Sequence, residues 1–239
     1  MVTYVRDQTG RFPQRPHYKQ EELDRECETI ITKFIKDLRG EVRFPVETED
    51  LKTLIERDAE DLDTYADLSV YGADVEGVTE FRPGRKPSVK IASLLTEDDR
   101  RENRLRTTLT HEYGHVRFHA HLFEVDPPQA DLLRRQPNRD KIICKRDSMI
   151  DAAQTDWMEW QAGYVCGALL MPKSAVLAIC REFSEQNKLY GPVSLQTAHG
   201  PALIARITIA FKVSNDAARV RLLKLGLVTP GPANRTLFD

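Results

Sequence analysis

The 239-residue chain has no long apolar run, few cysteines and almost no net charge. No hydrophobic stretch approaches the ~20 residues that a membrane-spanning helix needs. The first twenty residues contain neither a signal-peptide core nor an export pattern. The formal net charge of −2 excludes a strong attraction of the whole chain to nucleic acid or membrane. We therefore expect a cytoplasmic protein with no membrane association.

The four cysteines are scattered and form no C-x-x-C pair, which excludes a zinc ribbon or a redox motif of that spacing. Cys27 falls on the apolar stripe of a predicted helix, and we expect it in the core. Cys144 lies in a basic stretch. It could serve as a surplus metal ligand or a reactive thiol, although a single cysteine in a basic loop is more often neither.

The most informative segment is HEYGH, residues 111–115. On a helix, His111 and His115 stand one turn apart on the same face, so both can reach one metal ion. Glu112 then lies beside the remaining coordination site, where a water would be activated. The flanking apolar residues keep a period close to 3.6, and no proline interrupts them, which predicts a helix. These parts are the minimum for metal-assisted hydrolysis with Glu112 as the catalytic base.

Two histidines leave a metal under-coordinated, so a third protein ligand is expected. His119 continues the i+4 series, but it lies roughly 12 Å along the helix axis from His111, too far to share the metal. We expect His119 to be structural or to support the ligands. Glu159 is the better candidate, because it is an acid in the apolar segment 155–172 and a buried carboxylate needs a positive partner. Asp156, nearby, is interpreted as a helix N-terminal acid.

Two sequence patterns carry a resemblance to a known family. The first, R-x-R-x-T-x-x-H-E-x-G-H-x-x-x-H, is matched by Arg104, Arg106, Thr108, His111, Glu112, Gly114, His115 and His119. The second, E-x-x-A-N-x-F-A-A-x-L-L-M-P, is matched by Glu159, Ala162, Leu169, Leu170, Met171 and Pro172. In both, the chain resembles the ImmA/IrrE metallo-endopeptidases. The resemblance implies that Glu159 is the third ligand of a zinc ion, or alternatively of manganese.

Some positions depart from the family pattern. Gly163 stands where the family has asparagine, Val165 and Cys166 replace a Phe-Ala pair, and Thr107 replaces a phenylalanine. The resemblance therefore does not identify which side chains hold the metal ligands in place. A donor for the developing oxyanion is also expected. The sequence does not choose among the candidates for these supporting roles, which are His119, Tyr113, Tyr164 and Arg106.

The predicted fold class is α+β. Residues 1–18 are interpreted as a polar N-terminal arm, and residues 19–172 as a mainly helical metallopeptidase domain. A small three-stranded sheet is expected beside the HExxH helix, where an edge strand could hold an extended substrate by backbone pairing. Helices are predicted over Glu21–Leu38 and from Thr48, and strands near Asp67–Tyr71, Gly77–Phe81 and Ser88–Ala92.

Residues 173–239 are predicted to form a helical region that resembles a helix-turn-helix. One helix should end at Phe211, and the next should be capped by Ser214. From Lys173 onward there are nine Lys or Arg and four acids, so DNA binding is one interpretation. The alternative is an αα packing unit without a nucleic-acid role. The candidate contacts to DNA or a protein partner are Arg219, Arg221 and Lys224.

Two functional hypotheses result. The first is a metal-dependent endopeptidase that cleaves a helix-turn-helix transcriptional repressor and so derepresses stress-response or mobile-element genes. The second is a DNA-binding transcriptional regulator whose metal site is structural. Glu112 discriminates between them, because a purely structural site needs no general base.

Overall fold

The computed structural model describes residues 2–124, 141–145 and 156–231. The chain is α+β and divides into two compact units. Unit 1 comprises Met1–Leu23 and Glu47–Cys166, and unit 2 comprises Asp24–Val46 and Gly167–Asp239. Most of the first long helix thus belongs with the C-terminal residues, whereas the sequence assigned it to the peptidase domain. Local periodicity does not reveal this, because the partners of that helix are distant in sequence.

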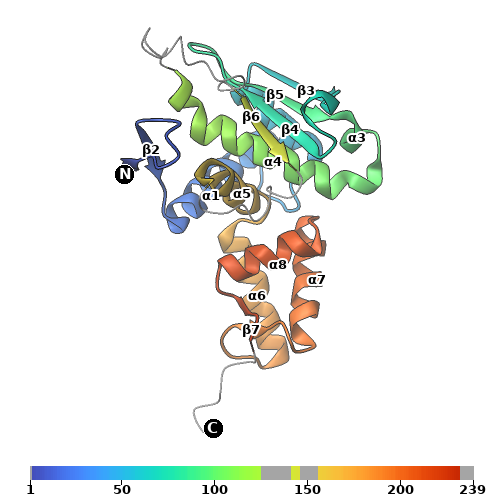
Figure 1. The fold of residues 1–239 in the computed structure, drawn as a ribbon. Coiled ribbons are helices and arrows are strands. Elements are labelled where there is room, and N and C mark those ends of the chain that lie inside the picture. The colour runs from blue at the N-terminus through green and yellow to red at the C-terminus, as the bar shows by residue number, and fades with distance from the viewer. Residues whose placement is uncertain (1, 125–140, 146–155, 232–239) are drawn as a thin grey trace. The chain divides into compact units, whose positions relative to one another are not determined.

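Unit 1 contains a four-stranded sheet in the order β3-β5-β4-β6 (Figure 1). Strand β3 is parallel to β5, whereas β4 is antiparallel to both of its neighbours, β5 and β6. The edge strand β6 comes from a basic stretch that the sequence analysis treated as a loop. The strands are β3 (Asp61–Ala66), β4 (Val75–Glu80), β5 (Ser88–Ala92) and β6 (Lys141–Lys145).

The predicted strands near Gly77–Phe81 and Ser88–Ala92 are confirmed as β4 and β5. The strand predicted near Asp67–Tyr71 is wrong, because β3 ends before it and Ser69–Tyr71 form the 3-10 helix η1. The Asp67 carboxylate accepts the backbone N–H of Ser69 at 2.9 Å. Such a local bond replaces ladder pairing and turns the chain.

The predicted HExxH helix is confirmed as α4, Glu102–His119. It packs against β4 and β5 of the sheet (Figure 1). Helix α2 (Thr48–Asp58) also packs against α4. From Leu105 to Val116 every residue of α4 is buried, including the polar ones. A helix surrounded by protein on all sides shows only a weak amphipathic pattern. The buried polar residues of α4 therefore need partners within the fold.

Three short helices lie before and after α4 in the chain. They are α3 (Ser93–Thr96), η2 (Asp99–Arg101) and η3 (Ala120–Phe123).

An aromatic cluster joins β6 to α5, Trp157–Leu170. Ile142 of β6 packs in this cluster with Trp157 and Met158 of α5. Phe81 and Phe123 stack within it, with ring centroids 4.0 Å apart. The cluster therefore holds β6 and the first turn of α5 beside each other. Of the described helices, none is by itself long and apolar enough to cross a membrane. Helix α5 and the next helix, α6 (Lys173–Asn187), meet those criteria when they are counted together across the bend between them.

The N-terminal residues form an antiparallel hairpin, β1 (Thr3–Arg6) and β2 (Gln14–His17), where the sequence suggested a polar arm. Asp7 is buried at the end of β1 and organises the turn. Its carboxylate accepts the N–H groups of Thr9 and Phe12, each at 3.0 Å. It also accepts the indole N–H of Trp157 at 3.2 Å. A single aspartate thus closes the hairpin and ties it to α5.

We expect Asp7→Asn to lower the free energy of unfolding at pH 7 by about 1.5–3 kcal/mol, because an amide cannot accept all of these donors. Burial raises the pKa of Asp7, but the N–H groups of Phe12 and Thr9 outweigh it and hold that pKa below 3.8. The stabilisation is therefore complete above the unfolded pKa and is lost as pH falls through the lowered folded pKa. Urea unfolding followed by tryptophan fluorescence measures it, since both tryptophans lie in α5. Equal stability of the two proteins at pH 7 would contradict this role.

Unit 2 is mainly helical over its described residues. Helix α7 ends at Phe211, Lys212 takes a left-handed conformation, and the Ser214 hydroxyl accepts the N–H of Ala217 at 3.1 Å at the start of α8. The predicted helix, turn and serine cap are therefore confirmed. The elements are α1 (Gln20–Arg39), α6 (Lys173–Asn187), β7 (Val193–Ser194), α7 (His199–Phe211), α8 (Asn215–Lys224) and β8 (Val228–Thr229).

Candidate metal centre

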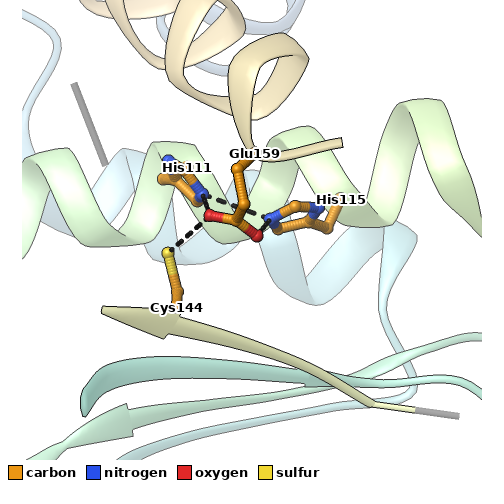
Figure 2. A group of neighbouring side chains, drawn as sticks. All are labelled: His111, His115, Cys144 and Glu159. Carbon is orange, nitrogen blue, oxygen red and sulfur yellow. Dashed lines mark hydrogen bonds and ion pairs between the residues drawn. The ribbon is translucent and has the colours of Figure 1, made fainter. Parts of the chain in front are cut away.

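Four buried side chains from three elements converge in unit 1 (Figure 2). His111 and His115 come from α4, Glu159 from the first turn of α5, and Cys144 from β6. Their potential ligand atoms all lie within 4.8 Å of one another. The Nε2 atoms of His111 and His115 are 3.1 Å apart. They lie 3.2 Å and 3.3 Å from the two carboxylate oxygens of Glu159.

The separations between the two imidazoles and Glu159 are close to those of a tetrahedral metal site, and the whole group of potential ligand atoms lies within 4.8 Å. Ligand atoms about 2.0–2.3 Å from a central zinc ion lie roughly 3.3–3.8 Å apart. The observed separations of 3.1–3.3 Å, and 3.5 Å between Cys144 Sγ and Glu159 Oε2, are close to that range. Two imidazoles, a carboxylate and a thiol are also a donor set that suits zinc. The cluster can therefore hold a metal ion; its identity is a matter for measurement.

The cluster carries charge that a cation would neutralise. Burial raises the pKa of Glu159, but the imidazoles of His115 and His111 outweigh it and hold that pKa well below its ordinary value. Burial, together with the carboxylates of Glu159 and Glu112, raises the pKa of the Cys144 thiol well above its ordinary value. Two carboxylates enclosed with a thiol are costly without a positive partner. A divalent cation between them would remove that cost.

A chain of hydrogen bonds fixes the tautomer of His115. The amide nitrogen of Gln161 donates to the carbonyl of Pro16 at 3.0 Å, so its oxygen faces His119 Nε2, also at 3.0 Å. Burial lowers the pKa values of both His119 and His115, and a histidine that binds a metal is neutral, so both rings are neutral when a cation occupies the cluster. His119 Nε2 must then carry the proton, and its Nδ1 accepts from Nδ1 of His115 at 2.9 Å. The lone pair of His115 Nε2 is left to face the cluster. His119 thus supports a ligand, as expected, although it cannot itself share the metal.

We expect Gln161→Leu to weaken Zn²⁺ binding by roughly 10–100-fold, because partners that orient a metal-binding imidazole contribute about that much. The substitution leaves all four cluster residues in place and removes the acceptor of His119, together with the donor to the Pro16 carbonyl. Competition with a coloured zinc chelator measures the affinity. Gln196→Leu, at an exposed glutamine of unit 2, is the matched control. If the two variants bound Zn²⁺ equally well, the hydrogen-bond chain would have no part in metal binding.

Glu112 lies beside the cluster and is completely buried. Its Oε2 accepts the hydroxyl of Thr79 at 2.5 Å, whereas its Oε1 has no hydrogen-bond partner among the described residues. Burial raises the pKa of Glu112 to about 7, against the opposing effects of His111 and Thr79. A carboxylate with a pKa near neutrality and one uncommitted oxygen can both accept and return a proton.

Gly77 of β4 makes room for this carboxylate. A Cβ atom at Gly77 would collide with Glu112 Oε1 and would approach its Cδ to 2.7 Å. Thr79, two residues along the same strand, lies on the same face and supplies the hydroxyl. Any residue other than glycine at position 77 would therefore displace the Glu112 carboxylate from its present place. A glycine inside a strand commonly marks such a close approach.

The other candidates for supporting roles have contacts with residues outside the cluster. The Tyr113 hydroxyl donates to Asp58 on α2 at 2.7 Å. The buried Arg106 donates to Thr48 at 3.3 Å, also on α2. The ring of Tyr164 packs beside Trp160, with centroids 5.9 Å apart. Tyr113 and Arg106 thus join α4 to α2, whereas His119 contacts His115 of the cluster. Asp156 accepts the N–H of Glu159 at 3.5 Å, in keeping with its interpretation as a helix N-terminal acid.

The basic candidates of unit 2 differ in exposure. Arg221 is buried, pairs with Asp24 at 2.7 Å and donates to the carbonyl of Met171 at 3.1 Å. Its guanidinium is therefore not at the surface where a DNA phosphate could reach it. Arg219 is exposed, and Lys224 is partly buried. Arg221 instead joins α8 to α1 within unit 2.

Sequence reasoning missed three contributors to the site. Gln161 is a polar residue in an apolar helix, which is the same signal that identified Glu159. Gly77 and Thr79 could have been noticed as a glycine and a hydroxyl on one face of a predicted strand. Cys144 was considered as a ligand but was placed in a loop. Its approach to Glu159 depends on the pairing of β6 with β4, for which the basic composition of the stretch gives no signal.

Comparison with protein-family models finds no match for this chain, and a search of curated proteins also finds none. The chemistry of the site is therefore the basis for a functional proposal. The resemblance of the α4 and α5 sequences to the ImmA/IrrE patterns adds an expectation about function to this chemistry.

Proposed function

We propose that the chain is a metal-dependent endopeptidase of the ImmA/IrrE type. The observation that carries the proposal is the buried, partly unpaired carboxylate of Glu112 beside His111, His115 and Glu159. A structural metal site has no use for such a group, because burying a second carboxylate is costly. A hydrolytic site needs one, since a base must take a proton from the attacking water.

The side chains divide the chemistry among themselves. His111, His115 and Glu159 would hold the cation, and Gln161 and His119 would keep His115 in the right tautomer. When bound, a divalent cation supplies Lewis acidity, which makes a water molecule more acidic and polarises a carbonyl group. Glu112 would take the proton of the attacking water on Oε1 and return it to the amine that leaves. The Thr79 hydroxyl would hold Oε2 and so aim the carboxylate during both transfers.

The substrate that we propose is a helix-turn-helix transcriptional repressor. Its cleavage would derepress stress-response or mobile-element genes. Support comes from the resemblance of the α4 and α5 sequences to the ImmA/IrrE patterns, and it extends no further than those patterns. The helix-turn-helix elements of unit 2 would then serve to contact a protein partner, with the exposed Arg219 as a candidate contact.

A second candidate function is a DNA-binding regulator with a structural metal site. Cys144 favours it, because a fourth protein ligand closes a zinc site and closed sites are usually structural. Burial of Arg221 counts against it, since this removes one of the basic residues that would contact DNA. Glu112 also has no explanation under this function. We therefore rank it below the peptidase.

The experiment that tests the proposal uses the full chain loaded with Zn²⁺. It is incubated with purified helix-turn-helix repressors encoded next to its gene, and fragments are identified by mass spectrometry. We expect cleavage at a defined bond, loss of cleavage after removal of metal with a chelator, and recovery on adding Zn²⁺. Tight sequence-specific DNA binding by the chain, with no cleavage of any repressor, would instead favour the second function.

A further inference from the structure

The position of Glu112 identifies the sheet edge on which a substrate must lie. Its carboxylate contacts Gly77 and is bonded to Thr79, both on β4. A peptide attacked by a water that Glu112 activates must therefore pass close to β4. The natural place is the edge of β4 that faces away from β5, where an extended peptide can pair with the strand.

In the structure this edge is occupied by β6 of the same chain. Strand β6 is antiparallel to β4, and Gly77 pairs with Cys144 while Thr79 pairs with Ile142. Paired residues project to the same face of a sheet. Cys144 and Ile142 therefore project to the face on which Glu112 lies, as a substrate's side chains would on the same edge.

The thiol of Cys144 lies where it would occupy the fourth coordination position of a metal ion held by His111, His115 and Glu159. Its Sγ lies 3.5 Å from Glu159 Oε2 and belongs to the same group of potential ligand atoms as His111 and His115. A metal held by three protein ligands keeps one position for water or substrate, whereas a fourth protein ligand fills it. A thiol that binds zinc gives up its proton and becomes a stronger ligand than water.

Lys141 anchors the other end of β6. Its ammonium group lies 3.0 Å from the Glu80 carboxylate and donates to the Tyr71 hydroxyl at 2.9 Å. Its carbonyl accepts from Arg11 at 3.2 Å. Strand β6 is thus held at both ends, by polar contacts at Lys141 and by the cluster at Cys144.

We propose that β6 is an internal inhibitor of the site. Its backbone covers the substrate edge of β4, and the Cys144 thiolate takes the metal's fourth position. This inference rests on the proposed peptidase function. A substrate must therefore offer an extended segment that replaces β6 on β4, and cleavage is slow until β6 is displaced. The thiol regains its proton from solvent when it leaves the metal.

The first test is spectroscopic and needs no activity. The full chain is loaded with Co²⁺, whose bond to a thiolate gives an intense near-ultraviolet charge-transfer band. We expect the band in the wild type and in Cys180→Ala, which removes another buried cysteine, in unit 2. We expect it to be absent from Cys144→Ala and Cys144→Ser, and the serine variant guards against a packing defect in the alanine one. A wild-type spectrum without the band would overturn the inference.

The second test measures cleavage of β-casein, an unstructured protein, by the Zn²⁺-loaded chain. Cys144→Ala should cleave it at least about tenfold faster than the wild type, because a site that is open in under a tenth of the molecules is slowed by that factor. Lys141→Met should accelerate cleavage to a smaller extent while keeping the Co²⁺ band. If Cys144→Ala were no faster than the wild type, the inhibitory role would be wrong.

The two tests separate this inference from the function on which it rests. Glu112-dependent cleavage by the wild type, with no acceleration in Cys144→Ala, would refute the inhibitory strand alone. Absence of Glu112-dependent cleavage from wild type and both Cys144 variants, with β-casein and with the neighbouring repressors alike, would refute the peptidase function and the inhibitory strand together. A thiolate band would then point to a closed structural site.

Discussion

Glu112→Gln is expected to lower the rate of repressor cleavage by about 10²–10⁴-fold, the usual contribution of a general acid–base. Glutamine is isosteric and can keep the bond from Thr79, but it cannot take a proton from water. Because Glu112 is not among the four residues of the cluster that could hold a metal ion, Zn²⁺ binding should be nearly unchanged. Steady-state cleavage of the repressor and zinc titration on the same preparation measure the two quantities.

Two further variants make this result specific. Glu56→Gln, at an exposed glutamate of α2, should cleave like the wild type. Glu112→Asp keeps the charge but withdraws the carboxylate by one methylene, and we expect an intermediate rate. Cleavage by Glu112→Gln at the wild-type rate would show that this carboxylate is not the base, and the peptidase proposal would lose its main support.

Glu159→Ala should weaken Zn²⁺ binding by roughly 10²–10³-fold. Protein zinc sites with four ligands bind with about 10–16 kcal/mol, so one ligand contributes about 3 kcal/mol on average. The variant also leaves His111 and His115 without the carboxylate that now lies 3.2 Å and 3.3 Å from them. Isothermal titration of the metal-free protein with Zn²⁺ measures the loss.

Asp156→Ala is the matched control for this variant. Asp156 is an exposed acid one turn before Glu159, and its carboxylate accepts a backbone N–H at the start of α5. Its removal should cost some helix stability and leave the zinc affinity within about threefold of the wild type. An unchanged affinity in Glu159→Ala would remove Glu159 from the metal site and with it the three-ligand arrangement.

The parts of the site that lie on single helices could be predicted from the sequence. The pair His111 and His115 follows from one helical turn, and His119 was excluded as a ligand by the rise of the same helix. Glu159 was found because an acid within an apolar segment needs a partner. The structure brings all three predicted ligands together in a group that could hold a metal ion, and it places His119 against His115.

The parts that depend on pairing between distant segments could not be predicted. Cys144 reaches the cluster only because β6 pairs with β4 in the register that sets it opposite Gly77. A one-residue shift of that register would turn the thiol to the other face of the sheet. Asp7 was likewise treated as part of a polar arm, because its partners Phe12 and Trp157 make sense only once the hairpin meets α5.

The buried ion pair of Arg221 shows the same limit in unit 2. Basic residues on the second helix of a helix-turn-helix pattern favour DNA contact when only composition is considered. Asp24, the partner of Arg221, lies far away in sequence at the start of α1. Charge alone therefore did not reveal which arginine is at the surface.

The most direct test of the metal centre is zinc K-edge X-ray absorption on the full chain loaded with one equivalent of Zn²⁺. We predict two imidazole ligands and one carboxylate oxygen at about 2.0–2.2 Å, with one sulfur at about 2.3 Å. The two imidazoles are the decisive feature, since His111 and His115 are the foundation of the site. A zinc shell without imidazole, or no stoichiometric binding of Zn²⁺, would contradict the account.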